Sequence, residues 1–234
     1  MITNKKILIT NDDGIEGKGL LYLVKEIYKF TTNILVVVPD QETSAVSHKM
    51  TLRKGLTLTK CKSIYQNIPT YTIDGTPSDC VKIATLYLKY EPDYVISGMN
   101  NGLNLGCDIL YSGTIAACFE AGLNNIKSLA FSCEREEFIA SKNIATVIKY
   151  IKEDQRLSNE LILNINMPIN PKGIKITTQG KNPFNTYYEE IDGKLYAKGV
   201  PLGKTTPQNL TSDVLNYHQG YVSITPLTID RTKY

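Results

Sequence analysis

Short, continuous apolar runs alternate with helix-like patterns along the first two thirds of the chain. Such runs are typical of strands buried on both faces of a parallel sheet. They occupy residues 6–10, 33–38, 93–98, 127–132 and 161–166. Apolar residues recur at helical spacing over residues 20–28, 80–88 and 144–151, and residues 114–123 are apolar nearly all round. This order predicts an α/β fold with a parallel sheet covered on both faces by helices.

The pattern changes after about residue 168. Asp192 and Gly193 lie between runs that carry Tyr and Leu, which predicts a hairpin with a two-residue turn, and residues 220–227 predict a last strand. We expect one domain, 1–234, with a core of about 1–168, a hairpin arm of about 174–200, and a C-terminal strand and tail of 201–234. The arm is expected to bury Tyr187, Tyr188 and Tyr196 against a second subunit rather than fold back on its own domain.

Composition narrows the function classes. Hydrophobic residues make up 42% and charged residues 21% of the chain, as in soluble globular proteins. The net charge of +3, from 26 basic and 23 acidic residues, is too small to indicate a nucleic-acid duplex as partner. No apolar run approaches the roughly 18 residues of a membrane helix, and the N-terminal run is too short for a signal peptide. We therefore expect a cytoplasmic protein without a membrane partner.

Cysteine and histidine are too sparse for a soft metal site. The five cysteines are scattered and never form C-x-x-C, which argues against a disulfide framework and a zinc site. The two histidines are His48 and His218, and we interpret His48 as a hydrogen-bonding loop residue. Any metal must therefore be held mainly by oxygen.

Polar loops follow three of the predicted strands, where ligands bind in open parallel sheets. The first carries Asp12 and Asp13, the second spans residues 39–48 and includes Ser44, and the third spans residues 98–114. Two acids among Ser and Asn oxygens suit a hard divalent cation such as Mg²⁺ or Mn²⁺, which would also explain the adjacent carboxylates. The alternative is a plain turn, with Asp13 as a helix cap.

The sequence YSGT, residues 111–114, precedes the helix expected over residues 114–123, which is apolar nearly all round and so expected to be buried. Backbone N–H groups at a helix start, with the Ser112 and Thr114 hydroxyls, can cradle a phosphate, and a simple N-cap is the alternative. Two other phosphate chemistries fit less well. The glycines after the first strand have the wrong order for a dinucleotide fingerprint. A covalent aspartyl phosphatase needs an acid where Asn11 stands, and Asn cannot attack phosphorus.

Five blocks, in order, resemble the SurE family of nucleotidases: ILITNDDGI, VVVPDQETSAVSHKMTL, IDGTPSDCVKIA, VISGMNNGLNLGCDILYSGTIAACFEAG and GYVSITPLTID. They run from about Ile7 to Asp230, nearly the whole chain. The resemblance implies a metal-dependent phosphatase of nucleoside 5′-monophosphates, with 3′-monophosphates as a further class. It also implies a Rossmann-like, three-layer core, one divalent cation per subunit, and a homodimer or homotetramer built partly from swapped C-terminal arms. A non-catalytic nucleotide sensor on the same fold is the alternative.

The resemblance also assigns site residues by position. The family's metal ligands fall on Asp12, Asp13, Ser44 and Asn100, and its phosphate contacts fall on Asn104, Ser112, Gly113 and Thr114. Asp12 or Asp13 is the expected proton acceptor for a water that attacks phosphorus directly. Thr43 stands where a basic residue commonly precedes the ligand serine, and Asn101 occupies a variable place, so the preferred base stays open.

Overall fold

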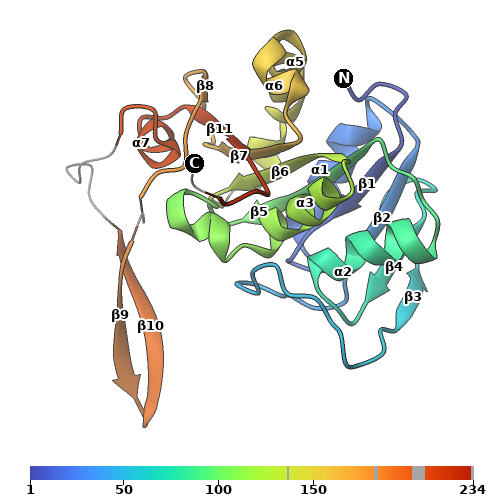
Figure 1. The fold of residues 1–234 in the computed structure, drawn as a ribbon, viewed down its shortest axis with the longest axis horizontal. Coiled ribbons are helices and arrows are strands. Elements are labelled where there is room, and N and C mark those ends of the chain that lie inside the picture. The colour runs from blue at the N-terminus through green and yellow to red at the C-terminus, as the bar shows by residue number, and fades with distance from the viewer. Residues whose placement is uncertain (136, 182–183, 202–208, 233–234) are drawn as a thin grey trace.

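The computed structural model describes residues 1–135, 137–181, 184–201 and 209–232, which form a nine-stranded sheet and a separate two-stranded hairpin (Figure 1). The strands of the main sheet, in spatial order, are β3 (Leu58–Cys61), β4 (Thr70–Ile73), β2 (Ile34–Pro39), β1 (Ile7–Thr10), β5 (Tyr94–Asn101), β6 (Lys127–Cys133), β7 (Ile162–Met167), β11 (Val222–Leu227) and β8 (Ile174–Ile176).

The centre of the sheet is parallel, as the continuous apolar runs predict. β1 pairs in parallel with β2 on one side and with β5 on the other, and every residue of β1 and β2 is buried. Two pairings depart from the expected parallel sheet: β3 pairs antiparallel with β4, and β11 pairs antiparallel with β7. The short connection between β3 and β4 accounts for the first case, since antiparallel neighbours need only a brief loop.

Helices cover both faces of the sheet and give three layers. One face carries α1 (Lys18–Tyr28), α4 (Glu137–Ser141), α5 (Ile144–Glu153) and α6 (Gln155–Asn159); the other carries α2 (Pro77–Lys82), its π-helical continuation η1 (Ile83–Tyr87) and α3 (Gly113–Leu123). Ile7 and Ile9 of β1 pack into the first core and Leu8 into the second, the alternation expected of a strand. The α/β prediction is confirmed. Of the helices described, none is long and apolar enough to cross a membrane.

Two short helices complete the body, the 3₁₀ helix η2 (Gly106–Leu110) and α7 (Asp213–His218). η2 lies in the long loop between β5 and α3. The carboxylate of Asp213 accepts hydrogen bonds from the backbone N–H groups of Gly106 at 2.9 Å and Gly180 at 2.8 Å. The start of α7 is thereby fixed to the loop before α3.

The hairpin of β9 (Phe184–Ile191) and β10 (Lys194–Pro201) extends away from the body of the molecule (Figure 1). Asp192 and Gly193 form its turn, with φ of 51° and 72°, as the two-residue hairpin signal predicts. The arm begins later than the sequence predicts. Residues 174–176, which the sequence pattern places in the arm, form β8 and pair in parallel with β11 at the edge of the main sheet.

Candidate active site

The loops after β2, β1 and β5 meet at one edge of the sheet. β1 lies between β2 and β5, and both pairings are parallel, so the carboxyl ends of the three strands share that edge. Asp12 and Asp13 follow β1, Ser44 lies in the loop after β2, and Asn100 lies near the end of β5. The four expected metal ligands therefore lie at the same edge.

Asp12 is buried against the start of α3. It is 4% exposed, and the Thr114 hydroxyl donates a hydrogen bond to its carboxylate oxygen Oδ1. A Cβ built on Gly113 would lie 2.9 Å from the Asp12 Cβ and 3.1 Å from its Oδ2, so only glycine leaves room for this contact. Burial raises the pKa of Asp12, and the Thr114 hydroxyl opposes that shift. Ser112 is the N-cap of α3, since its Oγ accepts a hydrogen bond from the Ile115 N–H at 3.1 Å.

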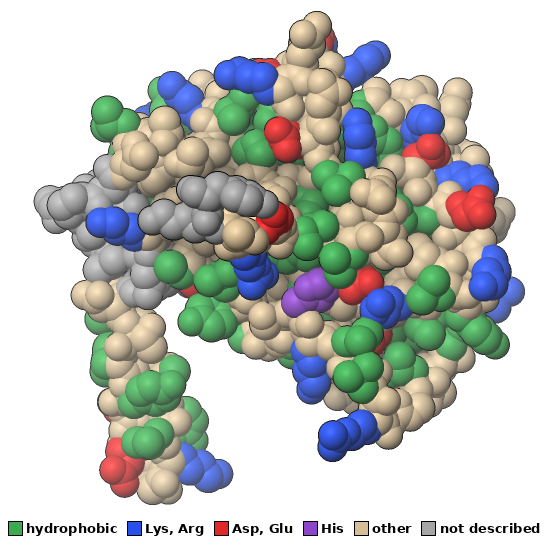
Figure 2. Space-filling view, viewed as in Figure 1, with side chains coloured by type: hydrophobic (Ala, Val, Ile, Leu, Met, Phe, Trp, Pro, Cys, Tyr) green, Lys and Arg blue, Asp and Glu red, His purple; other side chains and the backbone are tan. Residues whose placement is uncertain are grey.

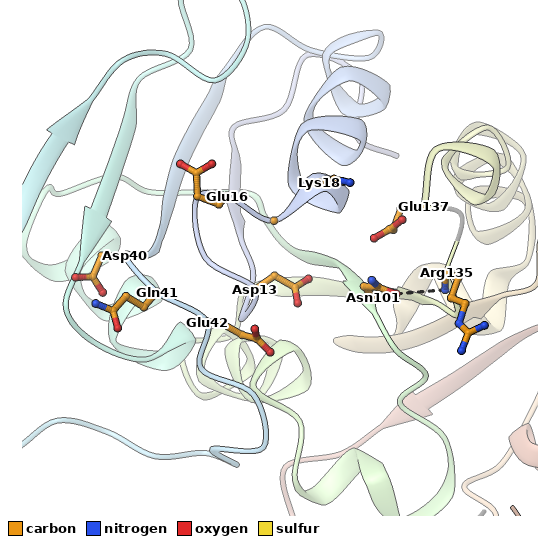
Figure 3. Close-up of a pocket in the computed structure, with 10 residues that line it drawn as sticks. Asp13, Glu16, Lys18, Asp40, Gln41, Glu42, Asn101, Arg135 and Glu137 are labelled. Carbon is orange, nitrogen blue, oxygen red and sulfur yellow. Dashed lines mark hydrogen bonds between the residues drawn. The ribbon is translucent and has the colours of Figure 1, made fainter.

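Asp13 lines an open cavity of about 580 Å³ between the loops and the starts of α1 and α4 (Figure 3). Five of the lining side chains are carboxylates, and two are cations: Asp13, Glu16, Asp40, Glu42 and Glu137 against Lys18 and Arg135. Burial and the neighbouring Asp12 carboxylate raise the pKa of Asp13 to about 6. The cavity is therefore acidic, and Asp13 is the carboxylate of the predicted pair that opens into it.

Ser44 and Asn100 form local hydrogen bonds. The Ser44 hydroxyl is exposed and donates to Glu42 Oε1 at 2.7 Å. Asn100 donates from Nδ2 to the Gly102 carbonyl at 2.9 Å. Both bonds use hydrogens of these side chains, so the Ser44 hydroxyl oxygen and the Asn100 amide oxygen keep lone pairs for a cation.

The loop that carries Ser44 is fixed at both ends. The Thr43 N–H donates to the Asp12 carbonyl at 2.8 Å, and His48 Nε2 lies 3.1 Å from Glu120 Oε2 on α3. Glu120 is 3% exposed and also pairs with Lys82 at 2.9 Å. Burial alone would raise the pKa of Glu120, but His48 and Lys82 hold it below its ordinary value. His48 is a hydrogen-bonding loop residue, as predicted.

Asn104 lies in a buried polar network. Its Nδ2 donates to the Ser132 hydroxyl at 2.8 Å. The side chains of Asn164 and Asn166 donate to its backbone carbonyl at 2.8 Å and 3.1 Å. An amide nitrogen carries two hydrogens, so Nδ2 keeps one donor for a ligand. These contacts hold Asn104 against β6 and β7 and were not visible in the sequence.

Two adjacent carboxylates without a cationic partner fit a divalent cation. In the described part of the chain, neither Asp12 nor Asp13 forms an ion pair. The described part of the chain contains no group of three or more His, Cys, Asp or Glu that could hold a metal. A metal site at Asp12 and Asp13 therefore depends on the Ser44 and Asn100 oxygens as well. Such an oxygen-only set suits Mg²⁺ or Mn²⁺.

Comparison with known proteins decides the family. The family model described as Survival protein SurE matches residues 7–186. The chain belongs to the SurE family. One relative, named 5′-nucleotidase SurE, from Caldanaerobacter subterraneus subsp. tengcongensis, is 38% identical over 97% of this chain and 93% of its own length. Another of the same name, from Thermoanaerobacter sp. (strain X514), is 40% identical over 98% of this chain and 94% of its own.

A solved SurE structure confirms the fold. The crystal structure of the SurE protein from Aquifex aeolicus is 31% identical, covers 97% of this chain and 95% of its own, and matches with a TM-score of 0.81. Both the resemblance to SurE and the α/β architecture expected from the sequence are confirmed.

Of the residues that line the cavity, the SurE resemblance assigned a site role only to Asp13, and the residues it did not assign include Glu16, Lys18, Arg135 and Glu137. Arg135 and Glu137 follow β6, the neighbour of β5, so the strand-end rule that selected the other loops also selects this one. The Arg135 N–H donates to Asn101 Oδ1 at 3.3 Å, which joins the loops after β5 and β6 (Figure 3). The run of charged residues at 134–137, directly after β6, was the sequence signal that could have identified this part of the cavity.

Proposed function

We propose that this SurE-family chain is a metal-dependent phosphohydrolase of nucleoside 5′-monophosphates, with 3′-monophosphates as a second substrate class. The observation that carries the proposal is the contact between β1 and α3. Asp12, at the end of the strand, meets the start of the helix through Thr114 and Gly113. A carboxylate for a cation and a helix start for a phosphate thus lie against each other. The name of the relatives, 5′-nucleotidase SurE, supports nucleotides as the substrates.

The acidity of the cavity supports a bound cation. A phosphate that approaches Asp13 meets five carboxylates, which repel it. One divalent cation per subunit, Mg²⁺ or Mn²⁺, held by Asp12, Asp13, Ser44 and Asn100, would neutralise charge on the phosphate and acidify water when bound. The two carboxylates contribute most of the affinity, because hard cations prefer charged oxygen ligands.

Side chains and backbone groups of the chain have the other catalytic and binding roles in this proposal. Asp13 opens into the cavity and accepts the proton of the attacking water. Asp12 is held in place by Thr114. The backbone N–H groups at the start of α3, with Ser112, Gly113, Thr114 and Asn104, bind the phosphate oxygens and stabilise the charge that develops on them.

Water attacks phosphorus directly in this proposal, and no covalent intermediate forms. Asn11 stands where a covalent phosphatase has its nucleophilic Asp, and its buried Nδ2 donates to the Gly14 carbonyl at 2.8 Å. A single turnover in isotopically labelled water should place the label in the released phosphate. Trapping of an acid-stable phospho-enzyme would refute direct attack.

A non-catalytic nucleotide sensor is the rival function. It predicts tight nucleotide binding without phosphate release. The discriminating experiment measures phosphate release and nucleotide binding for the same set of nucleoside 5′- and 3′-monophosphates. We expect release from at least one member of the set, and binding without release from every member would favour the sensor.

We also propose that the arm joins subunits into a homodimer or homotetramer. Tyr187, Tyr188 and Tyr196 are 52%, 67% and 45% exposed on a hairpin that extends from the body (Figure 1). Neighbouring Leu195 is 69% exposed. Apolar and aromatic side chains gathered on an extended arm indicate an interface, since isolated domains rarely expose such a surface.

A further inference from the structure

The candidate active site continues into a groove. A cavity of about 260 Å³ shares Asp40, Gln41 and Glu42 with the Asp13 cavity. The same small cavity shares Thr43, Lys54, Asp74 and Gly75 with a third cavity of about 520 Å³, which we call the far pocket and which is lined by residues 43, 46, 49–54 and 74–76. The three cavities therefore follow one another from Asp13 to the loop before β3.

Charge changes sign along this groove. The Asp13 cavity is acidic, whereas the far pocket has three cations, Lys49, Arg53 and Lys54, and one acid, Asp74. Lys54 pairs with Asp74 at 3.1 Å. Among the residues that the structure describes, Lys49 and Arg53 form no ion pair. In Figure 2, basic and hydrophobic side chains gather at the lower edge of the molecule. The far pocket thus presents two unpaired cations to a ligand.

Hydrogen bonds within the protein order the far pocket without a ligand. The Thr76 hydroxyl donates to the Lys49 carbonyl at 2.7 Å, and the Thr51 hydroxyl donates to Asp79 at 2.7 Å. On the other side of the pocket, the Thr57 N–H donates to Asp74 at 2.7 Å. These bonds fix the loop that carries Lys49 and Arg53 against the start of α2, so a ligand need not order it first.

We propose that the far pocket binds a second phosphate group, so that the preferred substrates are nucleotides with two separate phosphates, such as nucleoside 3′,5′-bisphosphates. The inference rests on the proposed function, because the first phosphate must occupy the Asp13 cavity. Between the two phosphates, Asp40 and Asp74 line the groove, where either carboxylate can accept a hydrogen bond from the ribose 2′-hydroxyl, the one sugar hydroxyl that a 3′,5′-bisphosphate keeps. Water forms the new bond to phosphorus, the ester P–O bond breaks, and the sugar oxygen leaves with a proton, which gives inorganic phosphate and a nucleoside monophosphate.

The test compares adenosine 5′-monophosphate with adenosine 3′,5′-bisphosphate as substrates of the parent protein, Arg53→Ala, Lys49→Ala and Arg53→Lys. We expect kcat/KM of the parent to favour the bisphosphate by about tenfold or more, the size of one charge-assisted hydrogen bond. Arg53→Ala and Lys49→Ala should each raise KM for the bisphosphate by about tenfold and leave the monophosphate unchanged, and Arg53→Lys should restore most of the loss. Lys149→Ala, 75% exposed on α5, is the matched control and should change neither substrate.

Two outcomes would overturn the proposal. One is equal kcat/KM of the parent for the two substrates. The other is an equal loss for both substrates in Arg53→Ala, which would make the far pocket a site for the nucleoside. If the parent released no phosphate from either substrate, the proposed function would fail instead. Calorimetric binding of the bisphosphate to the parent and to Arg53→Ala would then decide the far pocket alone, and equal affinities would rule it out.

Discussion

The hydroxyl of Thr114, at the start of α3, donates a hydrogen bond to the carboxylate of Asp12, at the end of β1. This bond favours the ionised form of a buried acid. Thr114→Val keeps the shape of the side chain and removes the donor. We expect kcat/KM to fall by roughly tenfold or more, the size of one hydrogen bond to a charged group, and added cation to restore less activity than in the parent.

Thr85→Val is the matched control for that change. The Thr85 hydroxyl donates to the Val81 carbonyl at 2.9 Å within its own helix, away from the cavity. The control should retain the parent kcat/KM. Equal losses in the two variants would mean that Thr114 acts only on stability.

Gly113 tests the closeness of α3 to Asp12. Even the methyl group of Gly113→Ala would lie 2.9 Å from the Asp12 Cβ and 3.2 Å from Pro77 Cγ, so Asp12 must move. We expect Gly113→Ala to fold and to lose most of its turnover, and Gly113→Val to lose nearly all turnover and to bind inorganic phosphate poorly. Gly55→Ala, where a Cβ meets nothing within 4 Å, is the control. A folded Gly113→Val enzyme with parental turnover would rule out the phosphate role of the YSGT sequence.

The raised pKa of Asp13 predicts how pH controls the cation. With a pKa of about 6, Asp13 is protonated below that pH in the cation-free protein, and a cation must displace the proton. Titration calorimetry with Mn²⁺ should show affinity that rises about tenfold per pH unit below the pKa and levels off above it. Asp13→Asn should remove most of the affinity and weaken this dependence, and the pH dependence that stays belongs to Asp12, whose pKa burial also raises. The same affinity in the parent at pH 5 and pH 7 would contradict the assignment.

The same shift affects stability in the absence of cation. The folded pKa of Asp13 lies above its ordinary 3.8, so the folded state binds the proton more tightly than the unfolded state. The free energy of unfolding of the cation-free protein should therefore fall as pH rises from about 4 through about 6, and added Mn²⁺ should reverse the loss.

The arm prediction is tested by mass in solution. Replacing residues 185–200 with a short Gly-Ser link removes the exposed tyrosines and leaves β8 and β11 in the sheet. We expect the variant to keep the helical signal of the parent and to sediment at a lower mass. An unchanged mass would show that the arm does not join subunits.

The sequence predicts the centre of the fold better than its edges. β1 and β2 are continuous buried runs, so local hydrophobicity identifies them. β3 has two half-buried and two exposed residues, so its hydrophobic pattern is weak. β8 has only three residues, and it pairs with β11, which begins far along the chain at Val222. Such short strands acquire their identity from distant pairing, and the start of the arm was therefore placed too early.

The sequence also predicts only part of the candidate active site. The strand-end rule predicts that the loops of Asp12, Ser44 and Asn100 meet, and the parallel pairing of β1 with β2 and β5 agrees. The bond between Thr114 and Asp12 joins residues 102 positions apart, and no local pattern predicts it. The contacts of Asn104 with Ser132, Asn164 and Asn166 are equally non-local.

Whether Asp12 and Asp13 hold a catalytic cation is tested by measuring phosphate release from a nucleoside 5′-monophosphate by chelator-treated protein, before and after addition of Mg²⁺ or Mn²⁺. We expect no release in chelator, recovery with either cation, and no recovery in Asp12→Asn, which keeps the size of the side chain and removes a charged ligand. Ser44→Ala should lose less, because a neutral hydroxyl binds the cation more weakly. Full activity of the parent in excess chelator, or parental activity of Asp12→Asn, would contradict a cation held at Asp12 and Asp13.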